Sequence, residues 1–439
     1  MKWLPLTKLK AERRGRSGRL FELAQDLMPG GVSSPVRAFG GVGGSPIFMS
    51  SGLGARLTDV DGNSYWDLVG SWGPLILGHA NPQVVEAIVK AARRGSTFGT
   101  STEGEIELAQ LVEDRFPSIE KLRFVSSGTE AAMTAIRLAR GATGRAKLIK
   151  MDGGYHGHSD SLLAAAGSGG LTFGVPSSAG VTQGTAADTL VVPFNDLGAV
   201  ERALEANRGQ VAALIVEPIP ANMGVVIPEP GYLQNLRSLT SASGTILIFD
   251  EVISGFRVAA GGAQELYGVV PDLTCLGKIL GGGLPLAAFG GRADLMNLLA
   301  PSGPVYQAGT LSGNPLATAA GAATLRQLRP QTYQQLELAA SSITAAVATG
   351  AEQLGVNLQV NRVGSMWTMF FNGESVRDAN TARASDSAQY AQFFHAALAS
   401  DVYLPPSQFE ACFVSSALLP PDVGWVADRL LAALSKIRS

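Results

Sequence analysis

Two stretches with the character of buried strands, each ending in a chemically active side chain, constrain this chain most. Residues 245–249 read TILIF, an apolar run that is typical of a strand covered on both faces of a parallel sheet. Asp250 follows it directly. A second apolar run at 273–276 is followed by Lys278 and then by three glycines. Open α/β sheets place their ligands at the carboxyl ends of such strands, so we expect Asp250 and Lys278 to face one site.

An acid and a lysine in this arrangement have two interpretations. They can form an ion pair at the sheet edge, although buried charge is costly unless it is paired or used. Alternatively, a lysine in a partly desolvated site loses its proton readily and can form a Schiff base with an aldehyde. Pyridoxal phosphate enzymes need such a lysine, together with an acid at the pyridinium nitrogen. Asp250 and Lys278 can supply both roles, and we favour this second interpretation.

Composition narrows the class of protein. The 439 residues carry a net charge of −2 and 46% hydrophobic residues, which fits a globular enzyme with a small-molecule substrate and predicts neither nucleic acid nor membrane binding. Only 16% of residues are charged and 53 are glycine, which favours an oligomer that covers apolar surface. The two cysteines and four histidines show no metal-binding spacing. The N-terminus does not resemble a secretory signal, so we expect a cytoplasmic enzyme.

Five longer motifs make the chain resemble the class III, pyridoxal-phosphate-dependent aminotransferases. The resemblance runs from Phe21 to the C-terminus and includes motifs that are most similar to the aminomutases of that family. It implies an α/β fold, the fold type I of pyridoxal-phosphate-dependent transferases, with a large, mostly parallel-sheet domain and a small α+β domain. The motifs are GGVSSPVRAF (30–39), DEVISGFR (250–257), PDLTCLGKILGGG (271–283), YQAGTLSGNP (306–315) and PSQFEACF (406–413).

The resemblance and the hydrophobic patterns together predict the organisation of the chain. We expect residues 1–70 to pack with the small domain, residues 71–325 to form the large cofactor-binding domain, and residues 326–439 to form the small domain. The patterns predict helices at 21–28, 130–140, 325–359 and 388–399, and strands at 147–151, 211–219, 245–249, 273–276 and 365–371. A Gly- and Ser-rich stretch at 167–184 is too long for an ordinary connection, which is typical of lids and binding loops, and the resemblance implies that it is a mobile flap.

Small residues between a strand and a helix predict a seat for the cofactor phosphate. The segment 124–130 reads FVSSGTE, and its turn would leave backbone N–H groups free at a helix N-terminus, where anions bind. A plain helix cap by Ser127 or Thr129 explains the residues equally well. The lysine nearby favours phosphate binding by Ser127, Gly128 and Thr129.

The resemblance assigns the remaining site residues. Gly309 and Thr310 reach the cofactor phosphate of the neighbouring subunit, which implies a homodimer with its active site at the interface. Tyr155 stacks on the cofactor ring, with His156 as support, and Asn222 lies near the cofactor. Taken alone, Arg37 reads as a surface arginine, but the family uses this segment to hold a substrate carboxylate. The substrate-binding residues would be Ser34, Arg37, Trp72, Ser168 and Glu410.

The activity expected from the resemblance is an amino-group shift within one short carboxylate substrate, with pyridoxal 5'-phosphate and pyridoxamine 5'-phosphate as the two forms of the cofactor. No metal is expected. An upstream tRNA-dependent reductase is implied as a partner. An ordinary ω- or β-amino acid aminotransferase with a separate keto acid, and a catalytically silent protein that binds pyridoxal phosphate, are the alternatives that the sequence leaves open.

Overall fold

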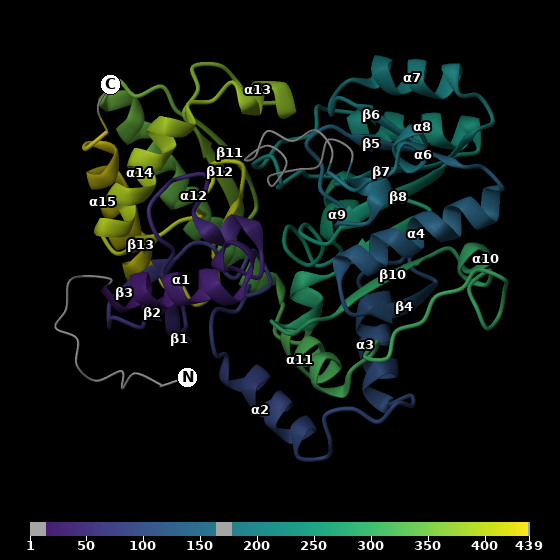
Figure 1. The fold of residues 1–439 in the computed structure, drawn as a ribbon, viewed down its shortest axis with the longest axis horizontal. Coiled ribbons are helices and arrows are strands. Elements are labelled where there is room, and N and C mark those ends of the chain that lie inside the picture. The colour runs from purple at the N-terminus through teal and green to yellow at the C-terminus, as the bar shows by residue number, and fades with distance from the viewer. Residues whose placement is uncertain (1–14, 164–177, 438–439) are drawn as a thin grey trace.

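The computed structural model describes residues 15–163 and 178–437. One seven-stranded sheet carries both the acid and the lysine (Figure 1), in the order β4-β10-β9-β8-β7-β5-β6. Strand β10 alone among them pairs antiparallel with its neighbours. The sheet is therefore mostly parallel, and the expected α/β fold class is confirmed. The strands are β4 (Lys121–Val125), β5 (Lys147–Met151), β6 (Thr189–Val192), β7 (Val211–Val216), β8 (Ile246–Glu251), β9 (Leu273–Leu276) and β10 (Ala287–Gly291).

Helices cover both faces of this sheet, which explains why its central strands are continuously apolar. In β8, Ile246 and Ile248 pack in the cluster that includes the helix α4 (Gly128–Thr143). Leu247 and Phe249 face the other way, into the cluster that includes α7 (Leu197–Ala206) and α8 (Tyr232–Ser243). The predicted double burial of this strand is therefore confirmed.

A second group of elements lies beside the large sheet (Figure 1) and joins the two ends of the chain. It contains a sheet of order β1-β2-β3-β13 and a sheet of order β11-β12-β14. Because β13 pairs with β3, N-terminal and C-terminal segments share one sheet, and we propose the division at about residues 70 and 325 on this basis. Its elements are α1 (Gly15–Leu27), β1 (Met49–Leu53), β2 (Arg56–Asp59), β3 (Ser64–Asp67), α12 (Pro330–Gln353), β11 (Gln359–Val363), β12 (Met366–Phe370), α13 (Ala379–Arg383), α14 (Ser387–Ala399), β13 (Val402–Tyr403), β14 (Cys412–Phe413) and α15 (Pro420–Leu434).

Three helices connect the two groups at the lower edge of Figure 1, where α11 packs against α2 and α3. They are α2 (Pro82–Ala92), α3 (Glu103–Glu113) and α11 (Pro315–Leu325). The short helices are α6 (Gln183–Ala187), α9 (Gly262–Tyr267), α10 (Ala293–Met296) and the 3-10 turns η1 (Pro29–Gly31), η2 (Pro35–Ala38), η3 (Asp160–Leu162) and η4 (Lys278–Gly281). Within the described ranges, no helix has the length and apolar character needed to cross a bilayer.

Three element predictions were wrong in their bounds. The helix predicted at 325–359 is α12, which begins at Pro330, a position that proline favours, and ends at Gln353, while Leu325 is the last residue of α11. The strand at 211–219 ends at Val216, before a proline that cannot donate to the ladder. The helix predicted at 21–28 is part of α1 (Gly15–Leu27), in which Ser17 and Ala24 are buried while Leu23 and Leu27 are exposed.

Other predictions were confirmed closely. Strand β5 has the expected bounds, and α14 differs from its prediction by one residue. Four large side chains lie on the buried face of α14, namely Tyr390, Phe393, Phe394 and Leu398. These elements are long or strongly patterned, and pattern is the most reliable sequence signal for them.

Candidate active site

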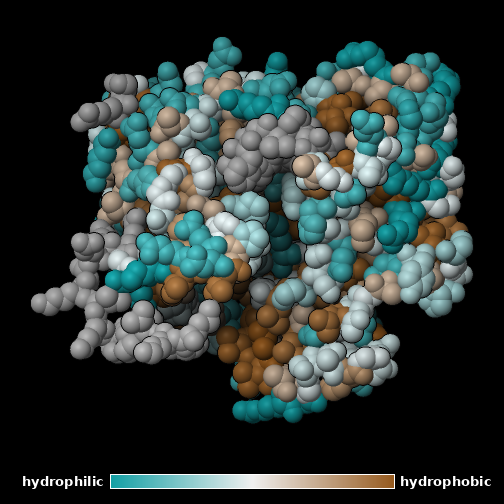
Figure 2. Space-filling model, in the orientation of Figure 1, coloured by the Kyte–Doolittle hydropathy of each residue, from teal (hydrophilic) through white to brown (hydrophobic). Residues whose placement is uncertain are grey.

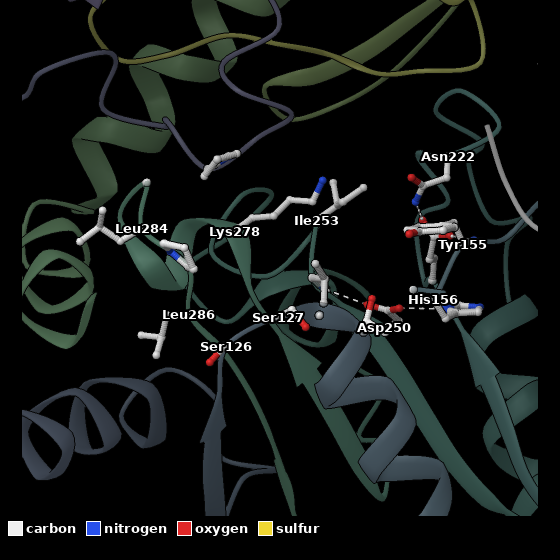
Figure 3. A pocket seen from close by; sticks show the side chains of 18 residues that line it. Ser126, Ser127, Tyr155, His156, Asn222, Asp250, Ile253, Lys278, Leu284 and Leu286 are labelled. Atoms are coloured by element: carbon white, nitrogen blue, oxygen red, sulfur yellow. Dashed lines mark hydrogen bonds and ion pairs between the residues drawn. The ribbon is translucent and has the colours of Figure 1, made fainter. Parts of the chain in front are cut away.

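The carboxyl ends of β7, β8 and β9 and the N-terminus of α4 surround one cavity of about 370 Å³. Figure 3 shows Lys278 extending toward the side of the cavity where Tyr155 and Asn222 lie, with Asp250 joined to His156 beneath them. The sheet therefore brings together the acid and the lysine, as the sequence predicts. The lining residues are Pro74, Ser126–Thr129, Tyr155–Gly157, Glu217, Asn222, Asp250, Val252, Ile253, Lys278 and Gly283–Leu286.

Asp250 is fixed by two hydrogen bonds at the end of β8. Its side chain is 5% exposed. One carboxylate oxygen accepts the Val252 N–H at 3.1 Å, and the other lies 2.7 Å from Nδ1 of the buried His156. The second ring nitrogen of His156 is buried without a hydrogen-bond partner among the described residues. The pair offers a held negative charge at the cavity floor, which suits a bound cationic ring nitrogen.

Lys278 lies at the start of η4, in a backbone conformation that side chains rarely adopt, with φ of 48°. Its Nζ donates to the backbone carbonyl of Trp72 at 2.7 Å. Burial lowers the pKa of Lys278, although Glu410, Glu217 and Asp250 oppose that shift. Desolvation therefore favours the neutral, nucleophilic amine. Strain of this kind is common at functional sites.

Glu217 organises the wall opposite the lysine and was missed as a site residue by sequence reasoning. It is 5% exposed, and it accepts the Tyr155 N–H at 2.8 Å and the Asn222 side-chain amide at 2.8 Å. Burial raises the pKa of Glu217, and the nearby His156 acts to lower it. The signal was available, because Glu217 follows the apolar run of β7 as Asp250 follows that of β8.

At the predicted phosphate seat the structure shows the helix cap, and phosphate binding stays a prediction. Ser127 caps α4, since its hydroxyl accepts the Glu130 N–H at 3.2 Å, and the Glu130 carboxylate in turn accepts the Ser127 N–H at 3.1 Å. This leaves the N–H groups of Gly128 and Thr129 at the mouth of a helix N-terminus. The Thr129 hydroxyl lies 3.2 Å from Nδ1 of His158. All three predicted residues line the cavity.

Four of the residues predicted for the substrate, Ser34, Arg37, Trp72 and Glu410, lie on other segments and do not line this cavity. Ser34 precedes η2, and Arg37 is exposed at its end. Burial raises the pKa of Tyr403, and the positive charge of the Arg37 guanidinium acts in the opposite direction. Trp72 is half-buried and turns its carbonyl, rather than its ring, to Lys278. Glu410 is half-buried, and among the charged groups it has the largest effect on the pKa of Lys278, which it raises. Ser168, with most of the predicted flap, lies outside the described residues.

Gly309 and Thr310 line a different hollow from the one that holds Lys278. This hollow is bounded by residues 97–101, Glu105 and the loop 309–315. Phe98, Ile106 and Leu311 are exposed nearby, at 51%, 63% and 52%. Figure 2 shows apolar residues gathered on the lower part of the molecule, where Figure 1 places α2 and α11. Such a patch is typical of an interface.

The family model described as aminotransferase class III matches residues 40–418. The chain belongs to the class III aminotransferase family. A protein of Roseiflexus castenholzii named glutamate-1-semialdehyde 2,1-aminomutase is 58% identical over 94% of this chain and 97% of its own.

Two solved structures place this class III chain among known folds. An omega-transaminase from Sphaerobacter thermophilus has a TM-score of 0.90 and 33% identity, over 98% of this chain and 99% of its own. A lysine-to-alanine variant of a glutamate-1-semialdehyde aminomutase from Pseudomonas aeruginosa, in complex with PMP, has a TM-score of 0.86 and 27% identity, over 96% and 95%. The expected membership of the class III family is confirmed.

The cavity of this class III protein fits a pyridoxal phosphate group on its own chemistry. A desolvated amine, a buried carboxylate and a helix N-terminus lie around one space, and these match an aldehyde, a ring nitrogen and a phosphate. Gly128 packs closely against the end of β8, because a Cβ there would lie 3.2 Å from a methyl of Val252. Among the described residues, no group of three or more potential ligands for a metal ion occurs.

Proposed function

We propose that this protein is a glutamate-1-semialdehyde 2,1-aminomutase, which converts (S)-4-amino-5-oxopentanoate to 5-aminolevulinate for tetrapyrrole synthesis. The observation that carries the proposal is the 58% identity over 94% of the chain to a protein of that name. The site contributes the matching chemistry, because a desolvated lysine and a buried acid face one cavity. The enzyme is an isomerase, since the substrate and the product have the same atoms.

Pyridoxal 5'-phosphate, with pyridoxamine 5'-phosphate as its amino form, is the cofactor of this activity. Bound in the cavity, it supplies an electron sink for the carbon that loses a proton. Lys278 would hold it covalently, and Asp250 would hold the ring nitrogen. Ser127, Gly128 and Thr129 would bind the phosphate, while Tyr155 would cover the ring and Asn222 would border it.

The residues of the chain divide the chemical work. The Lys278 amine, whose pKa desolvation lowers, would take a proton from one substrate carbon and return it to another. Asp250 keeps its charge in place through the bonds to His156 and Val252. Glu217 fixes the Tyr155 backbone and the Asn222 amide, so this wall does not have to reorganise during the reaction.

We propose that the substrate carboxylate is bound at the segment 34–37. The planar fork of Arg37 suits a carboxylate, and its exposure leaves the guanidinium available to a ligand. Ser34, Trp72, Ser168 and Glu410 would complete the substrate contacts. Glu410 is favoured by its electrostatic influence on Lys278.

We also propose a homodimer in which Gly309 and Thr310 act in the neighbouring subunit's site. Their hollow is separate from the cavity of their own chain, and exposed apolar residues surround it. A cytoplasmic location is favoured because both cysteines are buried and unpaired, which fits a reducing compartment. An upstream reductase that acts on a tRNA-bound substrate would supply the semialdehyde.

An ordinary aminotransferase is the second candidate. The likeness to the omega-transaminase, with a TM-score of 0.90, favours it. The two activities differ in their need for a second substrate. An aminotransferase must receive an amino acceptor in every cycle, whereas an aminomutase does not.

Parallel assays with two different substrate mixtures test the proposal. The purified enzyme is supplied with glutamate 1-semialdehyde alone, and in parallel with β-phenylalanine and 2-oxoglutarate. We expect 5-aminolevulinate from the first mixture and little turnover in the second. Rapid amino transfer in the second mixture, with no 5-aminolevulinate in the first, would establish the ordinary aminotransferase instead.

A further inference from the structure

A buried arginine stands behind the predicted catalytic lysine and has no role in the mechanism so far. Arg257 follows β8 in the motif that begins with Asp250, and it is 1% exposed. The ion pairs found among the described residues do not include it. A buried cation without a carboxylate partner is costly, so the presence of Arg257 at this position calls for a function.

The guanidinium joins three segments that are distant in sequence. One terminal nitrogen donates to the backbone carbonyl of Gly73, and the other donates to the Val414 carbonyl at 2.9 Å and to the Ser365 hydroxyl at 3.1 Å. The group also lies 5.3 Å from the ring centre of Phe413. Neutral acceptors therefore satisfy most of its donors and leave its charge uncompensated.

The Gly73 contact leads directly to the lysine. The neighbouring carbonyl, that of Trp72, accepts the hydrogen bond from Lys278 Nζ at 2.7 Å. A Cβ on Gly73 would lie 3.3 Å from the Phe413 ring and 3.5 Å from Cδ of Lys278. Gly73 has a φ of 109°, a backbone angle that residues other than glycine rarely adopt. This backbone is therefore held between Arg257, Phe413 and the stem of Lys278.

The charges around the lysine have opposing effects. Burial lowers the pKa of Lys278, three acids oppose that shift, and Arg257 acts in the same direction as burial. The acids are Glu410, Glu217 and Asp250. Burial also lowers the pKa of Arg257, to about 9, so the guanidinium remains largely charged at neutral pH.

We propose that Arg257 is a positioning residue for Lys278: its fork fixes the backbone that the lysine amine contacts, and its uncompensated charge disfavours a second cation beside it. The inference rests on Lys278 being the reactive lysine of the proposed function. It adds a residue outside the cavity that acts through Gly73 and Trp72. The fork and the charge make separate predictions, because lysine can replace the charge but not the planar fork.

Competitive acetylation of the apoenzyme tests the charge. Acetic anhydride is applied over a range of pH, and peptide mass spectrometry follows Lys278 against the exposed Lys436. We expect Arg257→Gln to raise the pH at which Lys278 becomes reactive, because a neighbouring positive charge is lost. Arg257→Lys should leave that pH near the wild-type value. The labelling needs no substrate, so it is independent of which reaction the enzyme catalyses.

The kinetics of the same variants test the fork. Arg257→Lys should lower kcat roughly 100-fold with little change in KM, since a misplaced reacting group costs about that much. Ser365→Ala is the matched control, because it removes a hydrogen bond from the same guanidinium on the side away from Lys278. It should leave the titration and kcat unchanged. Unchanged reactivity of Lys278 in Arg257→Gln, or wild-type kcat in Arg257→Lys, would overturn the proposal.

Discussion

The two sides of the candidate site are built in different ways. The cofactor side is formed by strand ends of the large sheet, and Asp250, His156 and Glu217 are buried and hydrogen-bonded there. The substrate side depends on irregular segments, where Arg37 is exposed. Within one chain the cofactor side already has its acid, its lysine and a helix N-terminus, and in our proposal the partner subunit adds Gly309 and Thr310 at the phosphate. The substrate side needs the bound substrate to become complete.

The largest effect should come from the cofactor side. Asp250→Asn removes the charge that would hold the ring nitrogen protonated, and we expect kcat to fall roughly 1,000-fold, since several kcal/mol of electrostatic interaction are lost. The measurement is turnover at saturating substrate, with circular dichroism to confirm the fold.

Glu251→Gln provides the matched control for that variant. The two acids are adjacent in β8, but Glu251 faces the other way and accepts N–H groups of Ala263 and Gln264. This variant should retain turnover per folded molecule. Equal losses in both variants would mean that the effect of Asp250 is structural rather than chemical.

The next effect should appear on the substrate side. Arg37→Ala is expected to raise KM for glutamate 1-semialdehyde about 100-fold, because the charge-assisted hydrogen bonds of a guanidinium–carboxylate pair contribute a few kcal/mol. Arg37→Lys should also bind poorly, since an ammonium cannot form the bidentate contact. Cofactor content, read from the absorption spectrum, should remain normal. An unchanged KM would place the carboxylate at another group.

Whether the partner subunit completes the site is tested by a partial recovery of activity, which is a smaller effect. Thr310→Glu adds a negative charge to the proposed phosphate contact, and Lys278→Ala removes the amine, so each variant alone should be inactive. Exchange of subunits gives mixed dimers with one intact site each, and we expect recovery of about a quarter of wild-type activity. If Thr310 served its own chain, the mixed dimers would contain no intact site and activity would stay absent.

The Glu251→Gln variant should have the smallest effect on activity, but it should change how the free energy of unfolding depends on pH. Burial raises its pKa from 4.5 to about 7, so between these pH values the folded state binds more protons than the unfolded state. Its contribution to stability is therefore fully present below pH 4.5 and is lost as pH rises through about 7, by up to about 3 kcal/mol. Urea unfolding of wild type and Glu251→Gln over this range isolates the difference. A constant difference would contradict the raised pKa.

The cofactor side was largely predictable from the sequence, and the substrate side was not. Apolar runs locate buried strands, and strand ends locate ligands, so Asp250 and Lys278 followed directly and Glu217 would have followed by the same rule. The pairing of His156 with Asp250 joins residues 94 positions apart, which no local pattern encodes. The orientation of Trp72, with its carbonyl toward Lys278, depends on a left-handed backbone that nothing in its residue type predicts.

Fold prediction shows the same division. The strands of the large sheet were recognised from continuous apolar runs, whereas the apolar residues that predicted α1 do not mark its buried face. Leu23 and Leu27 are 59% and 73% exposed, because α1 packs through the small side chains of Ser17 and Ala24. Apolar periodicity identifies the face that would prefer burial, but the chain alone does not show which surface covers it.

The central claim is that one substrate is rearranged without a second one. The most direct test is the number of 5-aminolevulinate molecules formed per subunit from glutamate 1-semialdehyde, with no keto acid or amino donor added beyond the bound cofactor. We predict sustained formation over many turnovers, with a rate that added 2-oxoglutarate does not increase. Formation of no more than one product per subunit, with turnover restored only by an added amino donor or acceptor, would contradict the account.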